Sequence, residues 1–138
     1  MKKTGLNRFD VVLLGVIFDP KTKRILIGKR RKDKHVPKLS WVFIGGRPSS
    51  NEEIEDTLKK KIKLKTGLDV ESLGSIFSRT HKEKRDFLLI YYLCEVVGGK
   101  EKPGDDLVEL KWVKPEEIEN YFATSFHPHM KEYVLNLK

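Results

Sequence analysis

The fold of this chain is decided by one stretch, WVFIGGRPSSNEEIEDTLKKKIKLKTGLDV, which spans residues 41–70. Ser50 and Glu53 are spaced as in a capping box, and acidic residues follow where a helix dipole favours them. Lysines are concentrated toward the other end, and Gly67 is typical of a helix stop. We therefore predict a helix over residues 51–66, preceded by a glycine loop that can approach an anion closely.

On a helical wheel of about 100° per residue, the apolar side chains of this helix form one arc. The members of that arc are Ile54, Thr57, Leu58, Ile62 and Leu64. Lys59, Lys60 and Lys63 fall outside the arc, and we expect them to be solvated. Lys61 and Lys65, one turn apart, fall inside it. These two lysines are either solvated as well or directed inward, where an ammonium group must snorkel or find an anion.

The same stretch resembles the Nudix box, a glycine followed by a glutamate and then by Arg-Glu-apolar-x-Glu-Glu-x-Gly-apolar. The residues in register with that box are Gly46, Glu52, Ile62, Gly67 and Leu68, with Lys60 in the arginine position. The three positions that the family fills with metal-binding glutamates hold Lys61, Leu64 and Lys65. The resemblance therefore implies the frame of a Nudix box without its metal ligands.

Length and composition predict a single domain over residues 1–138. The chain is 38% hydrophobic, which is enough for one core, and it contains no apolar stretch long enough to span a bilayer. Its single cysteine, Cys94, excludes an internal disulfide and favours a cytoplasmic protein. The formal net charge of +8 predicts an anionic partner. We favour a nucleotide over nucleic acid, because no aromatic stacking platform accompanies the charge, and we expect no membrane partner.

The order of predicted elements is mixed. Residues 11–18 and 24–29 predict a hairpin, residues 86–97 a long strand, and residues 108–113 a further strand. Residues 98–106 form a polar loop, Pro115 opens a short helix, and residues 128–137 predict a C-terminal helix. This α+β order is similar to that of the Nudix α/β/α sandwich around a mixed sheet.

Further stretches resemble the GDP-mannose mannosyl hydrolase branch of the Nudix family. They are Ile27-Gly28-Lys29-Arg30, Trp41, Gly45-Gly46-Arg47, Phe126-His127-Pro128-His129 and Tyr133. That branch releases the sugar from a nucleoside diphosphate by attack at the sugar carbon. The resemblance implies that His127 is the general base, that Arg30 and Arg47 lie beside the diphosphate, and that His81 is a further active-site histidine.

The metal of the family needs hard oxygen ligands. Lys61 and Lys65 reverse the charge of the glutamates they replace, and Gly15, near the place where the branch supplies an aspartate, has no side-chain oxygen. We therefore expect no helix-bound Mg²⁺, and Mg²⁺ only if substrate or loop acids hold it. We infer that the two ammonium groups replace the metal. They either contact ligand phosphate or pair with acids, of which Asp105, Asp106 and Glu109 are the candidates.

Two functions remain open. The first is a hydrolase of a nucleoside-diphosphate derivative, a nucleotide sugar such as GDP-mannose. The second is an inactive nucleotide-binding or regulatory module, and a homodimer is a candidate assembly for either. His127 opens a helix and is also a candidate cap, while His81 lies in a charged loop where a solvated histidine is common.

Overall fold

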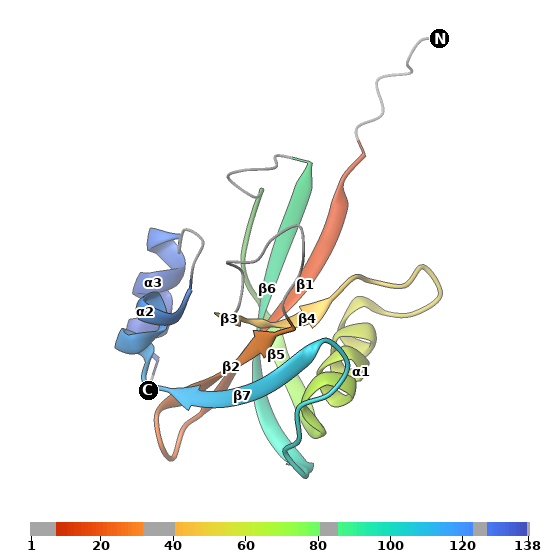
Figure 1. Ribbon diagram of the computed structural model, residues 1–138. Coiled ribbons are helices and arrows are strands. Elements are labelled where there is room, and N and C mark those ends of the chain that lie inside the picture. Colours follow the sequence, from red (N-terminus) through yellow and green to blue (C-terminus); the bar gives the residue numbers. More distant parts are fainter. Residues whose placement is uncertain (1–7, 32–40, 81–85, 123–126, 138) are drawn as a thin grey trace, which may run out of the picture.

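The computed structural model describes residues 8–31, 41–80, 86–122 and 127–137. Helices cover both faces of a mixed sheet (Figure 1). The helix α1 (Ile54–Thr66) packs on one face, and α2 (Ile118–Tyr121) and α3 (Pro128–Leu135) pack on the other. This arrangement confirms the predicted α/β/α sandwich.

The sheet has the order β3-β2-β1-β6-β5, with β4 paired to β1 and β7 paired to β2. Its strands are β1 (Asp10–Asp19), β2 (Arg24–Arg30), β3 (Trp41–Val42), β4 (Ile44–Gly46), β5 (Leu68–Thr80), β6 (Phe87–Gly99) and β7 (Leu107–Val113). Among the strand pairs that the structure describes, β1 and β6 are parallel and the others are antiparallel. A short 3₁₀ helix, η1 (Pro115–Glu117), leads from β7 into α2.

The segment 41–46 fills a wedge between β1 and β2. These two strands pair only near their turn, where residues 17–19 face residues 24–26. Beyond that point β4 pairs with residues 13–15 of β1, while β3 pairs with residues 28–29 of β2. The chain therefore leaves the interior of the sheet at Gly46, where β4 ends, and enters the loop before α1.

Two clusters of buried side chains stabilise the two faces. On the α1 side, Leu58 and Ile62 pack with Leu13 and Ile17 of β1. On the other side Val16 packs with side chains of α2 and α3. The alternation along β1 is that of a strand buried on both faces.

The helix α1 begins later than predicted and ends as predicted. It starts at Ile54, and its N-cap residue, Glu53, makes no side-chain capping bond, so the predicted Ser50 capping box was wrong. Gly67 ends the helix with a left-handed φ of 76°. A Cβ atom there would lie 2.1 Å from the carbonyl oxygen of Lys100, so only glycine fits.

The predicted apolar arc of α1 is narrower in the structure. Thr57, Leu58 and Ile62 are buried, but Ile54 and Leu64 are 41% and 56% exposed. The two outer positions lie beyond the edges of the helix contact with the sheet. The arc was therefore correct at its centre and wrong at its limits.

The hairpin β1–β2 and the strands β6 and β7 confirm the sequence prediction, as do the short helix and α3. The strand β5 was not predicted. It is an edge strand whose register shifts near Ser75, and its apolar residues do not alternate cleanly. No helix within the described ranges is long and apolar enough to cross a bilayer.

Candidate functional site

The glycine pair of β4 is required by a close approach of two backbones. A Cβ atom at Gly45 would lie 1.8 Å from the carbonyl oxygen of Leu13 on β1. Gly46 instead faces α1, and a Cβ atom there would lie 3.0 Å from Cδ of Lys61. The methylene stem of Lys61 therefore lies against Gly46, which is the snorkelling arrangement that the helical wheel allowed.

A cleft of about 280 Å³ opens beside this glycine pair. Four charged side chains from different parts of the chain line it: Arg30 of β2, Arg47 after β4, Lys65 of α1 and Asp106 before β7. We call it the basic cleft. Three of the predicted site residues, Arg30, Arg47 and Lys65, therefore meet at one place, whereas Lys61 does not line the cleft and lies against Gly46, which does.

The cations of the basic cleft are paired with two carboxylates. Lys65, with a side chain only 15% exposed, places Nζ 3.3 Å from Oδ1 of Asp106. The Nε atom of Arg30 lies 3.6 Å from Oδ2 of the same carboxylate. Arg47 pairs with Asp10 at 3.1 Å and also lies over the ring of Phe87. The pairing of Lys65 with Asp106 confirms one of the two roles that the sequence left open.

The three outer lysines of α1 have separate acidic partners. Lys63 pairs with Asp69 at 3.1 Å, and Lys59 lies 3.9 Å from Glu71. Lys60 contacts Glu52. Lys60 and Lys63 are exposed, as expected, whereas Lys59 is half-buried like Lys61 and Lys65, so exposure distinguishes only two of the three outer lysines from the inner pair.

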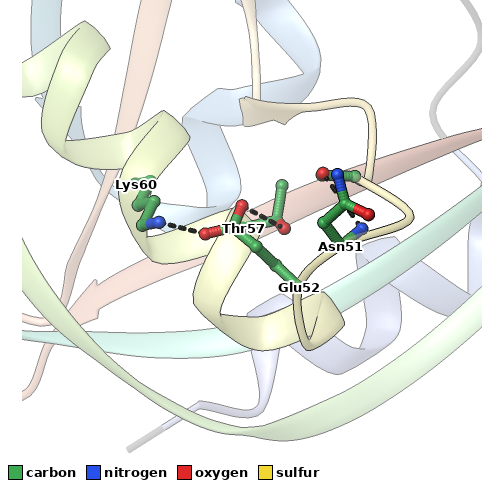
Figure 2. A network of polar contacts seen from close by, with 5 residues as sticks. Asn51, Glu52, Thr57 and Lys60 are labelled. Carbon is green, nitrogen blue, oxygen red and sulfur yellow. Dashed lines mark hydrogen bonds and ion pairs between the residues drawn. The ribbon is translucent and has the colours of Figure 1, made fainter.

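Glu52 joins the loop after β4 to the first turns of α1 (Figure 2). Its carboxylate accepts a hydrogen bond from Thr57 Oγ1 at 3.1 Å and contacts the ammonium group of Lys60. The hydrogen bond from Lys60 holds the pKa of Glu52 below its ordinary value. This link stabilises the loop beside the basic cleft and replaces the predicted capping box.

The residues present do not fit the metal ion that the Nudix resemblance implies. Two of the three ligand positions are ammonium groups, and the third, Leu64, is an exposed apolar side chain. Gly15 is buried, and a Cβ atom there would lie 2.9 Å from Ile62 Cδ1. Within the described part of the chain no three His, Cys, Asp or Glu side chains are grouped to hold a metal.

His127 lies at the start of α3 and does not line the basic cleft. Its Nδ1 atom accepts a hydrogen bond from the backbone N–H of His129 at 3.1 Å, so it caps the helix. Its ring contacts Phe77, which contacts Tyr91, and Tyr91 contacts Phe43, a residue of the cleft wall. Burial, with Arg79 and then His129 as further causes, lowers the pKa of His127.

Arg79 of β5 was missed by the sequence analysis. Its Nε atom is buried without a hydrogen-bond partner, beside Tyr91, whose pKa is raised by burial. No sequence signal marked this arginine, because the strand that carries it was not predicted. The predicted site residue His81 lies outside the described residues.

Comparison with known proteins agrees with this architecture. The NUDIX domain family matches residues 8–137, so the chain belongs to that family. An ADP-ribose pyrophosphatase of Methanocaldococcus jannaschii is 30% identical over 115 residues, which cover 81% of this chain and 66% of that protein. The chain thus spans a little under two thirds of the length of the curated relative it matches.

Solved structures show the same fold at low identity. A NUDIX hydrolase from Nitrosomonas europaea has a TM-score of 0.77 at 16% identity, over 94% of this chain and 72% of that one. An ADP-ribose pyrophosphatase from Streptococcus suis has a TM-score of 0.65 at 22% identity, over 79% and 76% of the two chains. These similarities establish the fold alone.

Proposed function

We propose that this protein hydrolyses a nucleoside diphosphate joined to a sugar, with GDP-mannose and ADP-ribose as the first substrates to test. The observation that supports this function is the convergence of Arg30, Arg47 and Lys65 on one cleft beside Gly45 and Gly46. ADP-ribose enters as a candidate through the matched pyrophosphatase, and GDP-mannose through the sequence resemblance.

The charges of the basic cleft suit a diphosphate. Guanidinium groups hold phosphate oxygens in bidentate geometry, and an ammonium group contributes a point charge. Arg30 and Arg47 would orient the two phosphates, while Lys61 and Lys65 would neutralise charge that develops on the leaving group. The glycine pair lines the same cleft.

His127 is the proposed general base. Because Nδ1 accepts a hydrogen bond from His129 N–H, the proton of the neutral ring is on Nε2, so His127 would take a proton from water at Nδ1, after it releases the His129 N–H. A lowered pKa keeps the imidazole neutral near pH 7, which is the form that accepts a proton. With the diphosphate in the basic cleft, the sugar would extend past Phe43 toward Phe77, whose ring contacts His127.

A second function is a binding module without turnover. It is favoured by the ammonium groups at the metal-ligand positions, since a chain that binds a nucleotide needs positive charge but no activated water. A nucleotide remains the expected ligand of such a module, and nucleic acid is the less favoured alternative. That the chain forms a single domain and that it assembles as a homodimer both remain predictions. Binding would raise the melting temperature without product and would weaken with salt.

One experiment separates the two functions. The protein is incubated with nucleoside diphosphates and nucleotide sugars, in Mg²⁺ and in a chelator, and the products are identified by mass spectrometry. Turnover that persists in the chelator supports the hydrolase with a built-in cation. Thermal stabilisation without product supports the binding module, and neither stabilisation nor turnover with any of these compounds contradicts both.

A further inference from the structure

Asp106 is the carboxylate that Lys65 and Arg30 of the basic cleft share. Its Oδ1 atom lies 3.3 Å from Lys65 Nζ, and its Oδ2 atom lies 3.6 Å from Arg30 Nε. Oδ1 is buried and has no partner in hydrogen-bond geometry, so its contact with Lys65 is one of charge. Asp106 therefore stands between two cations in the manner of a bound anion.

The backbone holds Asp106 at this position from both sides. The loop 100–106 is tied to the end of α1, where Lys102 N–H donates to the carbonyl oxygen of Thr66 and Gly104 N–H donates to that of Lys65. These carbonyls have no partner inside the helix, so the loop satisfies them. On the other side the carbonyl oxygen of Asp106 accepts the N–H of Arg31 at 2.8 Å.

The side chain, in contrast, is held by its two ion pairs. The side chain of Asp106 is 40% exposed where it lines the cleft, and within the described part of the chain its Oδ1 atom accepts no hydrogen bond. A phosphate that reaches Lys65 and Arg30 must take the position of this carboxylate. Displacement requires a rotation of one side chain and no change of the fold.

We propose that Asp106 is an internal counter-ion that competes with ligand phosphate, so that a single phosphate binds the basic cleft too weakly to occupy it while a diphosphate still binds. The proposal rests on the proposed function of the basic cleft. A single phosphate that displaces Asp106 gains at Lys65 and Arg30 only what the carboxylate gives up. A diphosphate can also reach Arg47, which lines the same cleft, so it gains a contact that Asp106 does not make.

The test compares Asp106→Asn with Asp105→Asn. Asparagine keeps the shape of residue 106 and removes its charge. Asp105 provides a matched control, because it carries the same charge one position earlier and is exposed. Its contact with Arg31 uses the backbone carbonyl, and its φ of 52° suits asparagine. Binding of pyrophosphate and of orthophosphate to each variant is measured by calorimetry at low salt, without divalent ions.

We expect Asp106→Asn to bind pyrophosphate about threefold to thirtyfold more tightly than the wild type, the range for two partly exposed ion pairs. Orthophosphate affinity should rise by a similar factor, because orthophosphate displaces the same carboxylate, so its binding becomes measurable, while Asp105→Asn behaves as wild type. Weaker binding by Asp106→Asn, or equal gains in both variants, would overturn the proposal. Binding of neither anion by any of the proteins would contradict the proposed function itself.

Thermal unfolding gives a second readout that distinguishes this role from a purely structural one. Without ligand, Asp106→Asn should melt below the wild type, because Lys65 and Arg30 then repel each other without a counter-ion. Saturating pyrophosphate should restore more stability to this variant than to the wild type. A loss of stability that pyrophosphate does not recover would also overturn the proposal.

Discussion

Gly45 on β4 lies against Leu13 on β1 so closely that a Cβ atom would stand 1.8 Å from the Leu13 carbonyl oxygen. Its neighbour Gly46 faces the flexible stem of Lys61, which is the nearest group to a Cβ atom added there. Two adjacent glycines thus have different reasons to lack a side chain. One is needed for the sheet, and the other leaves space for the stem of Lys61.

The two glycines should respond differently to alanine. Gly45→Ala forces backbone atoms apart and should lower the free energy of unfolding by about 3 kcal/mol or more, or prevent folding. Gly46→Ala displaces only a flexible side chain and should cost less than about 1 kcal/mol. Urea unfolding followed by circular dichroism measures both. Equal losses in the free energy of unfolding would show that the packing of β4 against β1 and α1 does not restrict Gly45 and Gly46 differently.

Lys65 and Lys63 form a matched pair for testing the basic cleft. Lys65→Met keeps the length of the side chain and removes the cation paired with Asp106, so pyrophosphate affinity should fall about tenfold or more. Lys63→Met removes the same charge from the outer side of α1, where the partner is Asp69, and should change affinity little. Calorimetric titration measures both. If the two variants weaken binding equally, only the net charge of the protein matters.

The cap and the base roles of His127 can be separated by choice of substitution. His127→Ala removes the acceptor for His129 N–H and should destabilise the protein by up to about 1 kcal/mol, whereas His127→Asn keeps an acceptor and should lose less. Both should lose turnover if His127 is the base. His129→Ala retains the N–H that His127 accepts and is the control that should keep turnover.

The pH profile provides an independent test of the same residue. Because the pKa of His127 is lowered from its ordinary value of 6.5, the neutral base should predominate by about pH 7. The value of kcat/KM should therefore rise with pH below 6.5 and level off above it, and the variant His127→Asn should lose this step. A wild-type rate that is flat between about pH 5 and 7 would argue against His127 as the base.

Cys94 should be inert in the folded protein. It is fully buried, and burial, with a smaller contribution from Glu55, raises its pKa to about 12. The reactive thiolate is therefore scarce at about pH 8, and iodoacetamide should label Cys94 only after unfolding in urea. Mass spectrometry of the native and unfolded protein tests this. Rapid labelling of the native protein would mean that this part of the core opens readily.

Local sequence signals predicted much of the framework. The end of α1 at Gly67 follows from a requirement for left-handed backbone, which glycine meets. The exposure of Lys60 and Lys63 follows from helical periodicity alone. The hairpin β1–β2 follows from two apolar runs around a polar turn. In each case the physical cause lies within a few residues of the feature, so the sequence displays it directly.

Signals that depend on distant partners were weaker or misleading. Ser50 and Glu53 have the spacing of a capping box, yet the side chain that fastens this loop is Glu52, through Thr57 and Lys60. Ile54 and Leu64 are apolar but exposed, because they lie beyond the part of α1 that the sheet covers. The sequence of α1 alone does not show how wide that covered part is. The edge strand β5 lacks a clear alternation, so Arg79 was missed with it.

The sequence by itself determined which chemical groups this protein has at the positions of a Nudix box, namely two ammonium groups and a leucine in place of carboxylates. Only the tertiary structure decided what those groups meet. The pairing of β2 with β7 and the attachment of the loop 100–106 to the end of α1 bring Arg30, Lys65 and Asp106 together. The physical reason is that periodicity and capping act over a few residues, whereas an ion pair forms only after the sheet has brought distant segments into contact.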